Sequence, residues 1–310
     1  MVGPYNSTVA AAQMPSSNKA GLLQCSPSAT SEGLTRPEAG AANLRPSRPD
    51  AINFTRTVTT NEIDPVGAAM YLLDSLGRKA VYMVDNGASS AVTRSDRFQR
   101  YWESRGATVV GRRSVTSDLT DYSTIIAEAK AAGADVVYFS GSSGASPIAV
   151  RILKAMRDGG LAVPFMGSGE IFDGTTGKKN SFLNLATGFD GTGVYMSYPA
   201  AGDYEGRKAF EDKFQAEYGH APSLYAITGY ACAEAILDAL SRTDLSLDRA
   251  ALRDAVRASA VDSRITYQSA MGDFRFDENG DTTLQIITIY DFETGAKDWR
   301  PVTYLDVPDQ

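Results

Sequence analysis

The stretch Lys79-Ala80-Val81-Tyr82-Met83-Val84 contains a short continuous apolar run. Such a run is typical of a strand that is buried on both faces of a parallel sheet. Apolar residues then recur at helical spacing over 93–105, where the pattern stops at Gly106, and a further strand begins at Thr108. Parallel strands need a crossover connection, so this order predicts a βαβ unit.

The same alternation continues on both sides of this stretch. Asp121 is a good N-cap for a helix over 122–132, and a second continuous apolar strand follows at 135–139. With a helix at 147–158 and a strand at 163–166, these steps predict a Rossmann-like lobe at about residues 60–195. Further elements are expected as helices at 64–76, 204–218, 224–242 and 250–258, and as strands at 274–281 and 283–292 joined by an Asn279-Gly280 hairpin turn.

The N-terminal residues predict two strands that each end in a hydroxyl-rich loop. Met1 to Thr8 matches the end of a buried strand and its loop, with Ser7 and Thr8 as the N-cap of a helix over 9–19. Residues 21–30 give a second strand with a Ser/Thr loop, and 28–49 is expected to be a long surface connection. Two such loops resemble half of a cradle for a polar small molecule, because the C-terminal ends of parallel strands meet at one sheet edge.

The composition excludes several classes of partner. A chain of 310 residues is long enough for two lobes with their own cores. Its net charge of −7 argues against nucleic acid and anionic membranes as partners, since both need clustered basic residues. The sequence shows neither a membrane-spanning stretch nor a signal peptide, and taken literally this predicts a cytoplasmic protein.

The residues that usually carry chemistry are sparse. Cys25 and Cys232 lie in apolar segments and are interpreted as buried small hydrophobic residues, with a disulfide between them left open. The single histidine, His220, sits at a predicted helix end, so a metal site is not expected. Gly141-Ser142-Ser143-Gly144 follows a strand but lacks the lysine of a phosphate-binding loop. We therefore expect no cofactor and no enzymatic activity.

Seven blocks together identify a family resemblance. In order and spacing the chain is similar to the branched-chain amino-acid-binding proteins, the type I periplasmic solute-binding proteins of ABC transporters. The blocks are Gly3–Ser7, Ser26–Thr30, Asn53–Thr57, Gly77–Tyr82, Asp118–Ser123, Pro164–Gly167 and Phe274–Asp281.

The resemblance implies an α/β fold of two Rossmann-like lobes, with parallel sheets, joined by a three-strand hinge. By that likeness lobe one comprises residues 1–57 plus 198–268, and lobe two with the hinge strands comprises 58–197 plus 269–310. Further βα units precede Met1 in the family, so lobe one is expected to be incomplete and less well formed than lobe two.

The resemblance also implies a ligand site in the cleft between the lobes. The loops that match Ser7 and Ser28, Ala29 and Thr30 hold the α-carboxylate and α-ammonium of an amino acid through backbone groups and short hydroxyls. The alternative is that Ser7 only caps a helix and that Ser28 and Thr30 lie in an ordinary loop.

Lobe two departs from the family pattern. Ser90 stands where the family often has a tyrosine, and the loop 140–146 is all small residues where a second aromatic is common. Gly169 occupies the place of the acidic partner for the ligand ammonium, and Glu170 follows it, with Asp173 nearby. We expect a roomier and more polar face, with Glu170 as ammonium partner or, alternatively, as a solvated loop acid.

The implied function is capture of an amino acid or similar small polar solute for an ABC permease, without catalysis. Such a protein is periplasmic or an extracytoplasmic lipoprotein if a signal precedes the chain. The alternatives are a cytoplasmic ligand-sensing domain of the same fold, a truncated remnant without function, and, least favoured, an α/β enzyme.

Overall fold

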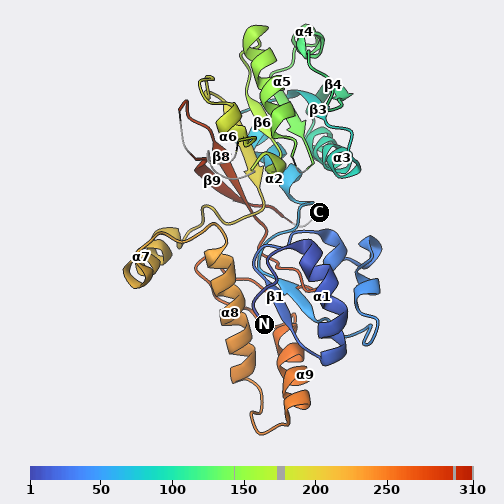
Figure 1. Cartoon of the computed structure of the whole chain (residues 1–310), viewed down its shortest axis with the longest axis vertical. Coiled ribbons are helices and arrows are strands. Elements are labelled where there is room, and N and C mark those ends of the chain that lie inside the picture. The colour runs from blue at the N-terminus through green and yellow to red at the C-terminus, as the bar shows by residue number, and fades with distance from the viewer. Residues whose placement is uncertain (143, 173–178, 296–297, 309–310) are drawn as a thin grey trace. The chain divides into compact units, whose positions relative to one another are not determined.

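A computed structural model describes residues 1–142, 144–172, 179–295 and 298–308 (Figure 1). The chain forms two compact units. Unit 1 comprises Met1–Asn61, Pro199–Ile286 and Asp306–Gln310, and unit 2 comprises Glu62–Tyr198 and Ile287–Leu305.

Unit 2 is built on a sheet of seven strands in the order β4-β3-β5-β6-β7-β8-β9 (Figure 1). The strands β3 to β7 run parallel, and β8 is antiparallel to β7. Their bounds are β3 (Ala80–Asp85), β4 (Thr108–Ser114), β5 (Val136–Ser140), β6 (Phe165–Gly167), β7 (Val194–Tyr198), β8 (Ile286–Asp291) and β9 (Arg300–Asp306). The predicted α/β fold with a parallel sheet is confirmed.

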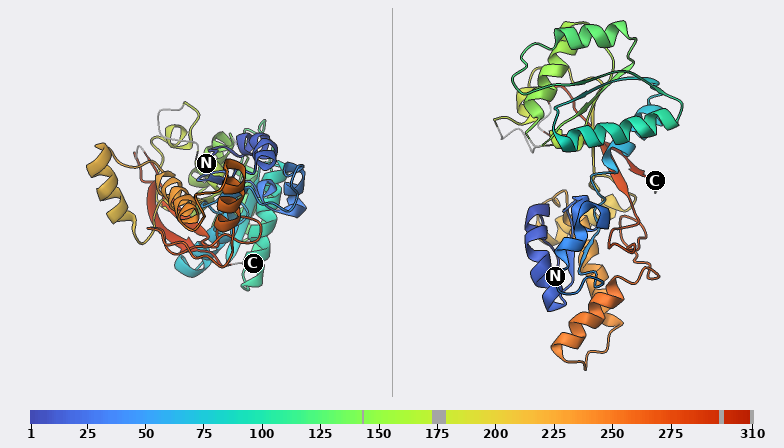
Figure 2. Two further views of the ribbon diagram at one scale, coloured as in Figure 1. Left: turned by 90° about the horizontal axis from the view of Figure 1, so that it is seen from below. Right: turned by 90° about the vertical axis from the view of Figure 1, so that its right-hand side faces the viewer.

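Helices cover both faces of this sheet. The helix α3 lies on the opposite face from α4 and α5, as the right-hand view of Figure 2 shows. This follows from right-handed crossovers, because the chain steps outward from β3 to β4 and then returns past β3 to β5. The bounds are α2 (Asp64–Met70), which continues as a π-helical turn η4 (Tyr71–Ser75), α3 (Ser89–Ser104), α4 (Ser123–Ala131), α5 (Ser146–Asp158), the 3-10 turn η5 (Gly169–Ile171) and α6 (Phe182–Leu185).

Two helix starts in unit 2 differ from the prediction. Helix α3 begins at Ser89 rather than Thr93, and Ala88 at its N-cap has no side chain that could mark the start. Helix α4 begins at Ser123 with Tyr122 at the N-cap position. Asp121 still accepts a hydrogen bond from the Ser123 amide at 2.8 Å, so it supports the first turn from one residue further out.

Unit 1 has a much smaller sheet. Strand β1 (Gln24–Ser26) pairs in parallel with β2 (Phe54–Arg56), and Val2 forms an isolated parallel bridge to Cys25. Helix α8 packs against β1, beside a core that contains Cys232, Phe274 and Phe276. It also packs against α9, where Ala239 and Ala260 form a smaller cluster with Leu23. The helices of this unit are α1 (Ser7–Ala20), α7 (Arg207–Tyr218), α8 (Ala226–Ser241) and α9 (Arg249–Ala260).

Three predictions for unit 1 are wrong. The N-cap of α1 is Asn6, not Ser7 or Thr8, because the Asn6 carboxamide accepts a hydrogen bond from the Thr8 amide at 2.8 Å. Residues 28–49 are not simply a surface connection, since Leu34 is buried against Met14. Residues 274–281 form isolated bridges rather than a regular strand. The segment 28–49 contains three 3-10 turns, η1 (Glu32–Leu34), η2 (Pro37–Ala39) and η3 (Ala41–Leu44).

The two cysteines form a disulfide, which corrects their interpretation as separate buried residues. Cys25 lies on β1 and Cys232 on α8, with a Cα–Cα distance of 5.6 Å. Packing of α8 on β1 places the two side chains together across 207 residues of sequence. Burial alone could not distinguish this pair from two unlinked thiols.

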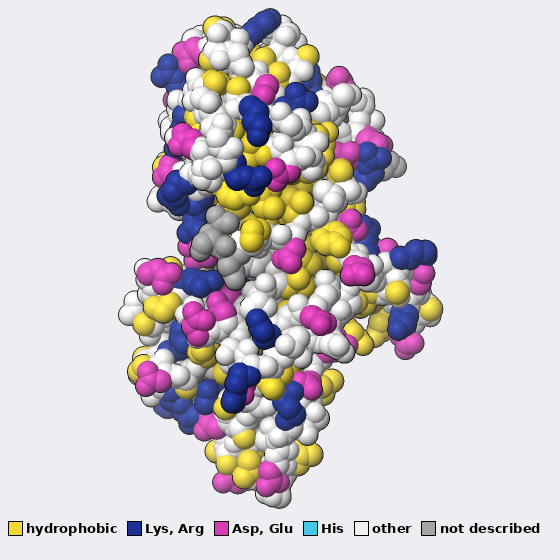
Figure 3. All heavy atoms as spheres, turned by 180° about the vertical axis from the view of Figure 1, so that it is seen from behind, with side chains coloured by type: hydrophobic (Ala, Val, Ile, Leu, Met, Phe, Trp, Pro, Cys, Tyr) yellow, Lys and Arg dark blue, Asp and Glu magenta, His cyan; other side chains and the backbone are white. Residues whose placement is uncertain are grey.

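The surface carries a mixture of charges. On the face drawn in Figure 3, basic and acidic side chains are interspersed over both units. Within the described residues, no helix is both long enough and apolar enough to cross a bilayer. The described part of the chain also contains no group of three or more His, Cys, Asp or Glu side chains that could hold a metal ion.

Candidate functional site

The buried guanidinium of Arg56 binds backbone carbonyls of the loop that follows β1. Arg56 is 0% exposed, and its Nη1 donates to the carbonyl oxygens of Ala29 at 2.8 Å and Ser31 at 2.9 Å. The two ends of a planar trans peptide point in opposite directions. The Thr30 amide N–H, which shares a peptide with the Ala29 carbonyl, therefore faces away from Arg56. Among the described residues it has no hydrogen-bond partner.

Serine hydroxyls fix the remaining shape of this loop. The Ser26 hydroxyl accepts from the amides of Ser28 and Ala29, at 3.3 and 2.9 Å. It donates to the Pro4 carbonyl at 2.6 Å, and the Ser28 hydroxyl donates to the Tyr5 carbonyl, also at 2.6 Å. The loop after β1 is thus tied to the loop that precedes α1.

Helix α1 begins beside the same loop. The Ser7 hydroxyl accepts a hydrogen bond from the Ser31 amide at 3.3 Å, so the first turn of α1 adjoins residues 28–31. The structure therefore brings Ser7, Ser28, Ala29 and Thr30 together in unit 1. Unpaired amides at a helix N-terminus and a free loop amide are the donors that a carboxylate prefers.

An aromatic pair next to this loop was missed from the sequence. The rings of Tyr5 and Tyr225 meet edge to face, with centroids 5.5 Å apart. Tyr5 is 66% exposed, and Tyr225 stands at the N-cap of α8. The signal available in the sequence was an aromatic residue directly after Pro4 in a loop rich in polar side chains.

The two ligand residues predicted for unit 2, Ser90 and Glu170, lie on different elements. Ser90 is exposed in the first turn of α3. Glu170 lies in η5, immediately after β6, and forms an ion pair with Arg94 of α3, with 2.5 Å between Nη2 and Oε1. Arg94 also donates to the Gly141 carbonyl at 2.9 Å. Glu170 is therefore not simply a solvated acid, and Arg94 is a residue that the sequence interpretation did not include.

The buried carboxylate of Asp64 lies close to the Arg94–Glu170 ion pair. Asp64 accepts a hydrogen bond from the Gly169 amide at 3.2 Å. Burial raises the pKa of Asp64 to about 6, although hydrogen bonds with Ser197 and Gly169 and the charge of Arg94 favour the ionised form.

Gly169 itself has no room for a side chain. A Cβ there would lie 2.8 Å from the Tyr198 ring and 3.1 Å from the Ser197 carbonyl oxygen. At the place where the family resemblance implies an acid, the Tyr198 ring and the Ser197 carbonyl thus leave no room for a side chain. Asp173, the other acid noted nearby, and Ser143 of the small-residue loop lie outside the described residues.

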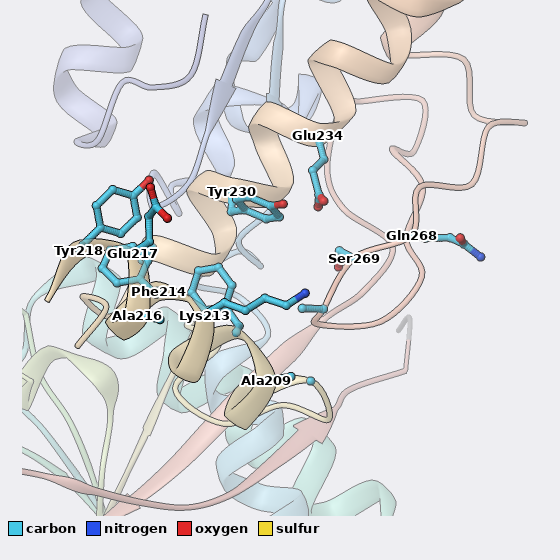
Figure 4. Close-up of a pocket in the computed structure, with 14 residues that line it drawn as sticks. Ala209, Lys213, Phe214, Ala216, Glu217, Tyr218, Tyr230, Glu234, Gln268 and Ser269 are labelled. Carbon is cyan, nitrogen blue, oxygen red and sulfur yellow. The ribbon is translucent and has the colours of Figure 1, made fainter. Parts of the chain in front are cut away.

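Unit 1 also has an open hollow of about 1010 Å³ between α7, α8 and residues 268–270 (Figure 4). Tyr230 and Glu234 project into it from α8, toward Phe214 and Lys213 of α7. Burial raises the pKa of Glu234, partly offset by its hydrogen bond with Tyr230. None of the six predicted ligand residues lines this hollow.

Comparison with known proteins identifies the family. The model of a family described as periplasmic binding protein matches residues 1–296. The chain belongs to this family. A relative of this periplasmic binding protein, the Leu/Ile/Val-binding protein homolog 1 of Brucella abortus (strain 2308), is 25% identical over 303 residues. The match covers 96% of the chain and 72% of the relative.

Solved structures share the fold of this periplasmic binding protein. The ABC transporter substrate-binding protein of Desulfitobacterium hafniense in complex with Leu matches with a TM-score of 0.70 at 20% identity, over 96% of this chain and 79% of that one. A solute-binding protein of an ABC transporter from R. palustris in complex with benzoate matches with a TM-score of 0.62 at 20% identity. That match covers 99% of this chain and 77% of the other.

Proposed function

We propose that this chain is the substrate-binding protein of an ABC transporter. It captures an amino acid or similar small solute that bears a carboxylate, and it presents the solute to an ABC permease. The observation that carries the proposal is the Thr30 amide, which is unpartnered, lies beside the first turn of α1, and is oriented by Arg56.

Carboxylate recognition in unit 1 has two supports. Backbone donors fixed before binding cost little reorganisation when the anion arrives, and the N-terminus of α1 favours negative charge. Leucine and benzoate, which occupy the two structural relatives, have a carboxylate in common.

The lobes and ligand residues predicted from the sequence are consistent with this role, and we include them in the proposal. Lobe one (1–57 plus 198–268) would recognise the carboxylate through Ser7, Ser28, Ala29 and Thr30. In lobe two (58–197 plus 269–310), Ser90 and Glu170 remain the proposed ligand contacts. The Cys25–Cys232 disulfide supports a location outside the cytoplasm, because disulfides persist in oxidising compartments.

A thermal-shift titration tests the proposal. The purified chain is melted alone and with each common amino acid, simple amides and small carboxylic acids. A ligand at about 100 times its Kd should stabilise the folded chain by roughly 2.7 kcal/mol, which raises the Tm.

Two variants at one position locate the interaction. Thr30→Pro removes the amide donor, whereas Thr30→Val keeps the donor and removes only the hydroxyl. We expect Thr30→Val to retain the ligand-induced shift and Thr30→Pro to lose it, with both variants melting cooperatively. A wild-type melt that no carboxylate shifts contradicts the proposed function.

A further inference from the structure

The Cys25–Cys232 disulfide lies next to the loop that is proposed to bind the carboxylate of the solute. Both cysteines are buried, at 1% and 0% exposed. Ser26 follows Cys25 at the end of β1, and its hydroxyl accepts a hydrogen bond from the Ala29 amide at 2.9 Å. One hydrogen bond and one residue of backbone therefore link the Thr30 amide to the residue after the disulfide.

The backbone of Cys25 also holds the segment that leads into α1. Its amide donates to the Met1 carbonyl at 2.9 Å, and its carbonyl accepts from the Gly3 amide at 2.7 Å. The Ser26 hydroxyl in turn donates to the Pro4 carbonyl at 2.6 Å. A displacement of Cys25 would therefore move both loops that carry the candidate ligand contacts of unit 1.

The other half of the disulfide belongs to α8, which also contacts the first of these loops. Tyr225, at the N-cap of α8, meets the Tyr5 ring edge to face. Thr57, directly after β2, donates its hydroxyl to the Thr228 carbonyl at 2.8 Å, and the same hydroxyl lies 3.5 Å from the Cys232 sulfur. Helix α8 is thus joined to the sheet at the disulfide and to the Tyr5 loop at its own start.

Reduction would change this arrangement at Cys25. A dithiol reductant breaks the S–S bond through a mixed disulfide. Its two thiols become an internal disulfide, two electrons pass to the protein, and two protons end on the sulfurs of Cys25 and Cys232. Two sulfur atoms that are not bonded need more separation than a bonded pair. Because a protein interior is close-packed, β1 and α8 have to move apart to provide it.

We propose that the Cys25–Cys232 disulfide positions the carboxylate-binding loop, so that the oxidised chain binds its solute more tightly than the reduced chain. The two cysteines do not touch the solute and act through Ser26 on the Thr30 amide. This inference rests on the proposed function, because it concerns the same loop of unit 1. Solute capture is then adapted to an oxidising compartment.

Calorimetric titration of the oxidised and the reduced wild type tests the inference. The probe is leucine or benzoate or, if neither raises the wild-type Tm, the acid of the thermal-shift series that does. The reduced form is refolded in dithiothreitol, thiol counting verifies two free thiols per chain, and a melting curve verifies folding. We expect the reduced chain to bind the probe about fivefold more weakly, the effect of one lost hydrogen bond.

Two controls separate positioning from other effects of reduction. Met271 is 6% exposed in the same core as the cysteines, so Met271→Ala lowers stability there while the disulfide stays intact. We expect Met271→Ala to bind the probe as tightly as wild type. Cys25→Ala/Cys232→Ala should bind the probe equally with and without dithiothreitol, since it has no bond to reduce.

The rate of reduction gives a second readout that does not need a folded reduced chain. A buried disulfide reacts only when its surroundings open. A solute that binds the closed loop should therefore slow the release of thiols from the oxidised wild type. With the probe at about ten times its Kd, we expect thiol release to be about tenfold slower.

The outcomes are distinct. Equal affinity of the oxidised and reduced chains, or thiol release that the probe does not slow, overturns the inference and leaves the proposed function intact. A loss of affinity in Met271→Ala as large as the loss on reduction also overturns it, since lower stability would then explain both. If no acid of the series binds the oxidised chain, the proposed function itself fails.

Discussion

Arg56 and Asp281 form a buried ion pair in unit 1, with 2.6 Å between Nε and Oδ1. Asp281 also accepts from the Thr35 hydroxyl at 3.0 Å and lies 3.1 Å from Arg36. The same guanidinium holds the carbonyls of Ala29 and Ser31. The shape of the loop at residues 28–31, which is proposed to bind the carboxylate of the solute, therefore depends on Asp281. This acid lies 225 residues beyond Arg56 in the chain.

Removing Asp281 should destabilise the chain strongly. Asp281→Ala leaves the buried Arg56 charge without its counter-ion, and such losses typically cost about 3–5 kcal/mol. Urea unfolding measures the free energy. Asp254→Ala is the matched control, because the Arg48–Asp254 pair is 39% exposed on both sides and should contribute less than about 1 kcal/mol. Equal losses in the two variants would contradict this ranking.

The disulfide should stabilise unit 1. Replacing both Cys25 and Cys232 by alanine is expected to lower the free energy of unfolding by about 2–5 kcal/mol, since the bond restricts a long loop in the unfolded chain. Chemical unfolding of the double variant is compared with that of wild type. Reductant should lower the wild-type midpoint toward that of the variant and leave the variant unchanged. A wild-type midpoint insensitive to reductant would count against the bond.

Asp64 should make stability depend on pH in an unusual direction for a carboxylate. Its pKa in the folded chain is about 6, above the ordinary value of 3.8, so the folded state binds its proton more tightly than the unfolded state. Its contribution is fully present below about pH 4 and is lost as the pH rises through 6. The loss amounts to roughly 3 kcal/mol at 1.36 kcal/mol per pKa unit.

Asp64→Asn removes this titration and keeps an oxygen acceptor for the Gly169 amide. We therefore expect the variant to gain stability relative to wild type as the pH rises from 4 to 7. Urea unfolding of both proteins across this range measures the difference. A difference that is constant with pH would refute the assignment.

Gly169 should tolerate no larger residue. In Gly169→Ala the new Cβ meets the Tyr198 ring and the Ser197 carbonyl oxygen, which predicts a loss of about 1–3 kcal/mol. Gly229→Ala in α8 is the control, since its Cβ would meet only Pro27 at 3.9 Å. The control should be neutral or slightly stabilising, because alanine favours helix more than glycine does. Thermal melts of both variants measure the change in Tm. An unchanged Tm in Gly169→Ala would contradict the prediction.

Local sequence patterns predicted the elements of unit 2 well. The continuous apolar runs at 79–84 and 135–139 are strands β3 and β5 within a residue or so, because a buried parallel strand has no polar face. Element ends were less accurate where no cap residue marks them, as at Ala88 before α3. Strand β9 (Arg300–Asp306), which alternates exposed and half-buried residues, was not predicted.

The features that decide the candidate site are long-range pairs. Arg94 and Glu170 are separated by 76 residues, and Arg56 and Asp281 by 225. Each residue alone resembles an ordinary surface charge, and only the packed fold shows its partner. The loop residues Ser7, Ser28, Ala29 and Thr30 could be named from a family resemblance, but the guanidinium that orients them could not.

The most direct test of the central claim follows the Thr30 amide by NMR. A ¹⁵N-labelled chain is titrated with small carboxylates, leucine and benzoate included. The account predicts a saturable shift of the Thr30 amide resonance that follows the binding of the carboxylate. A ligand that saturates the protein and leaves this amide unmoved, or a chain that no carboxylate binds, would contradict it.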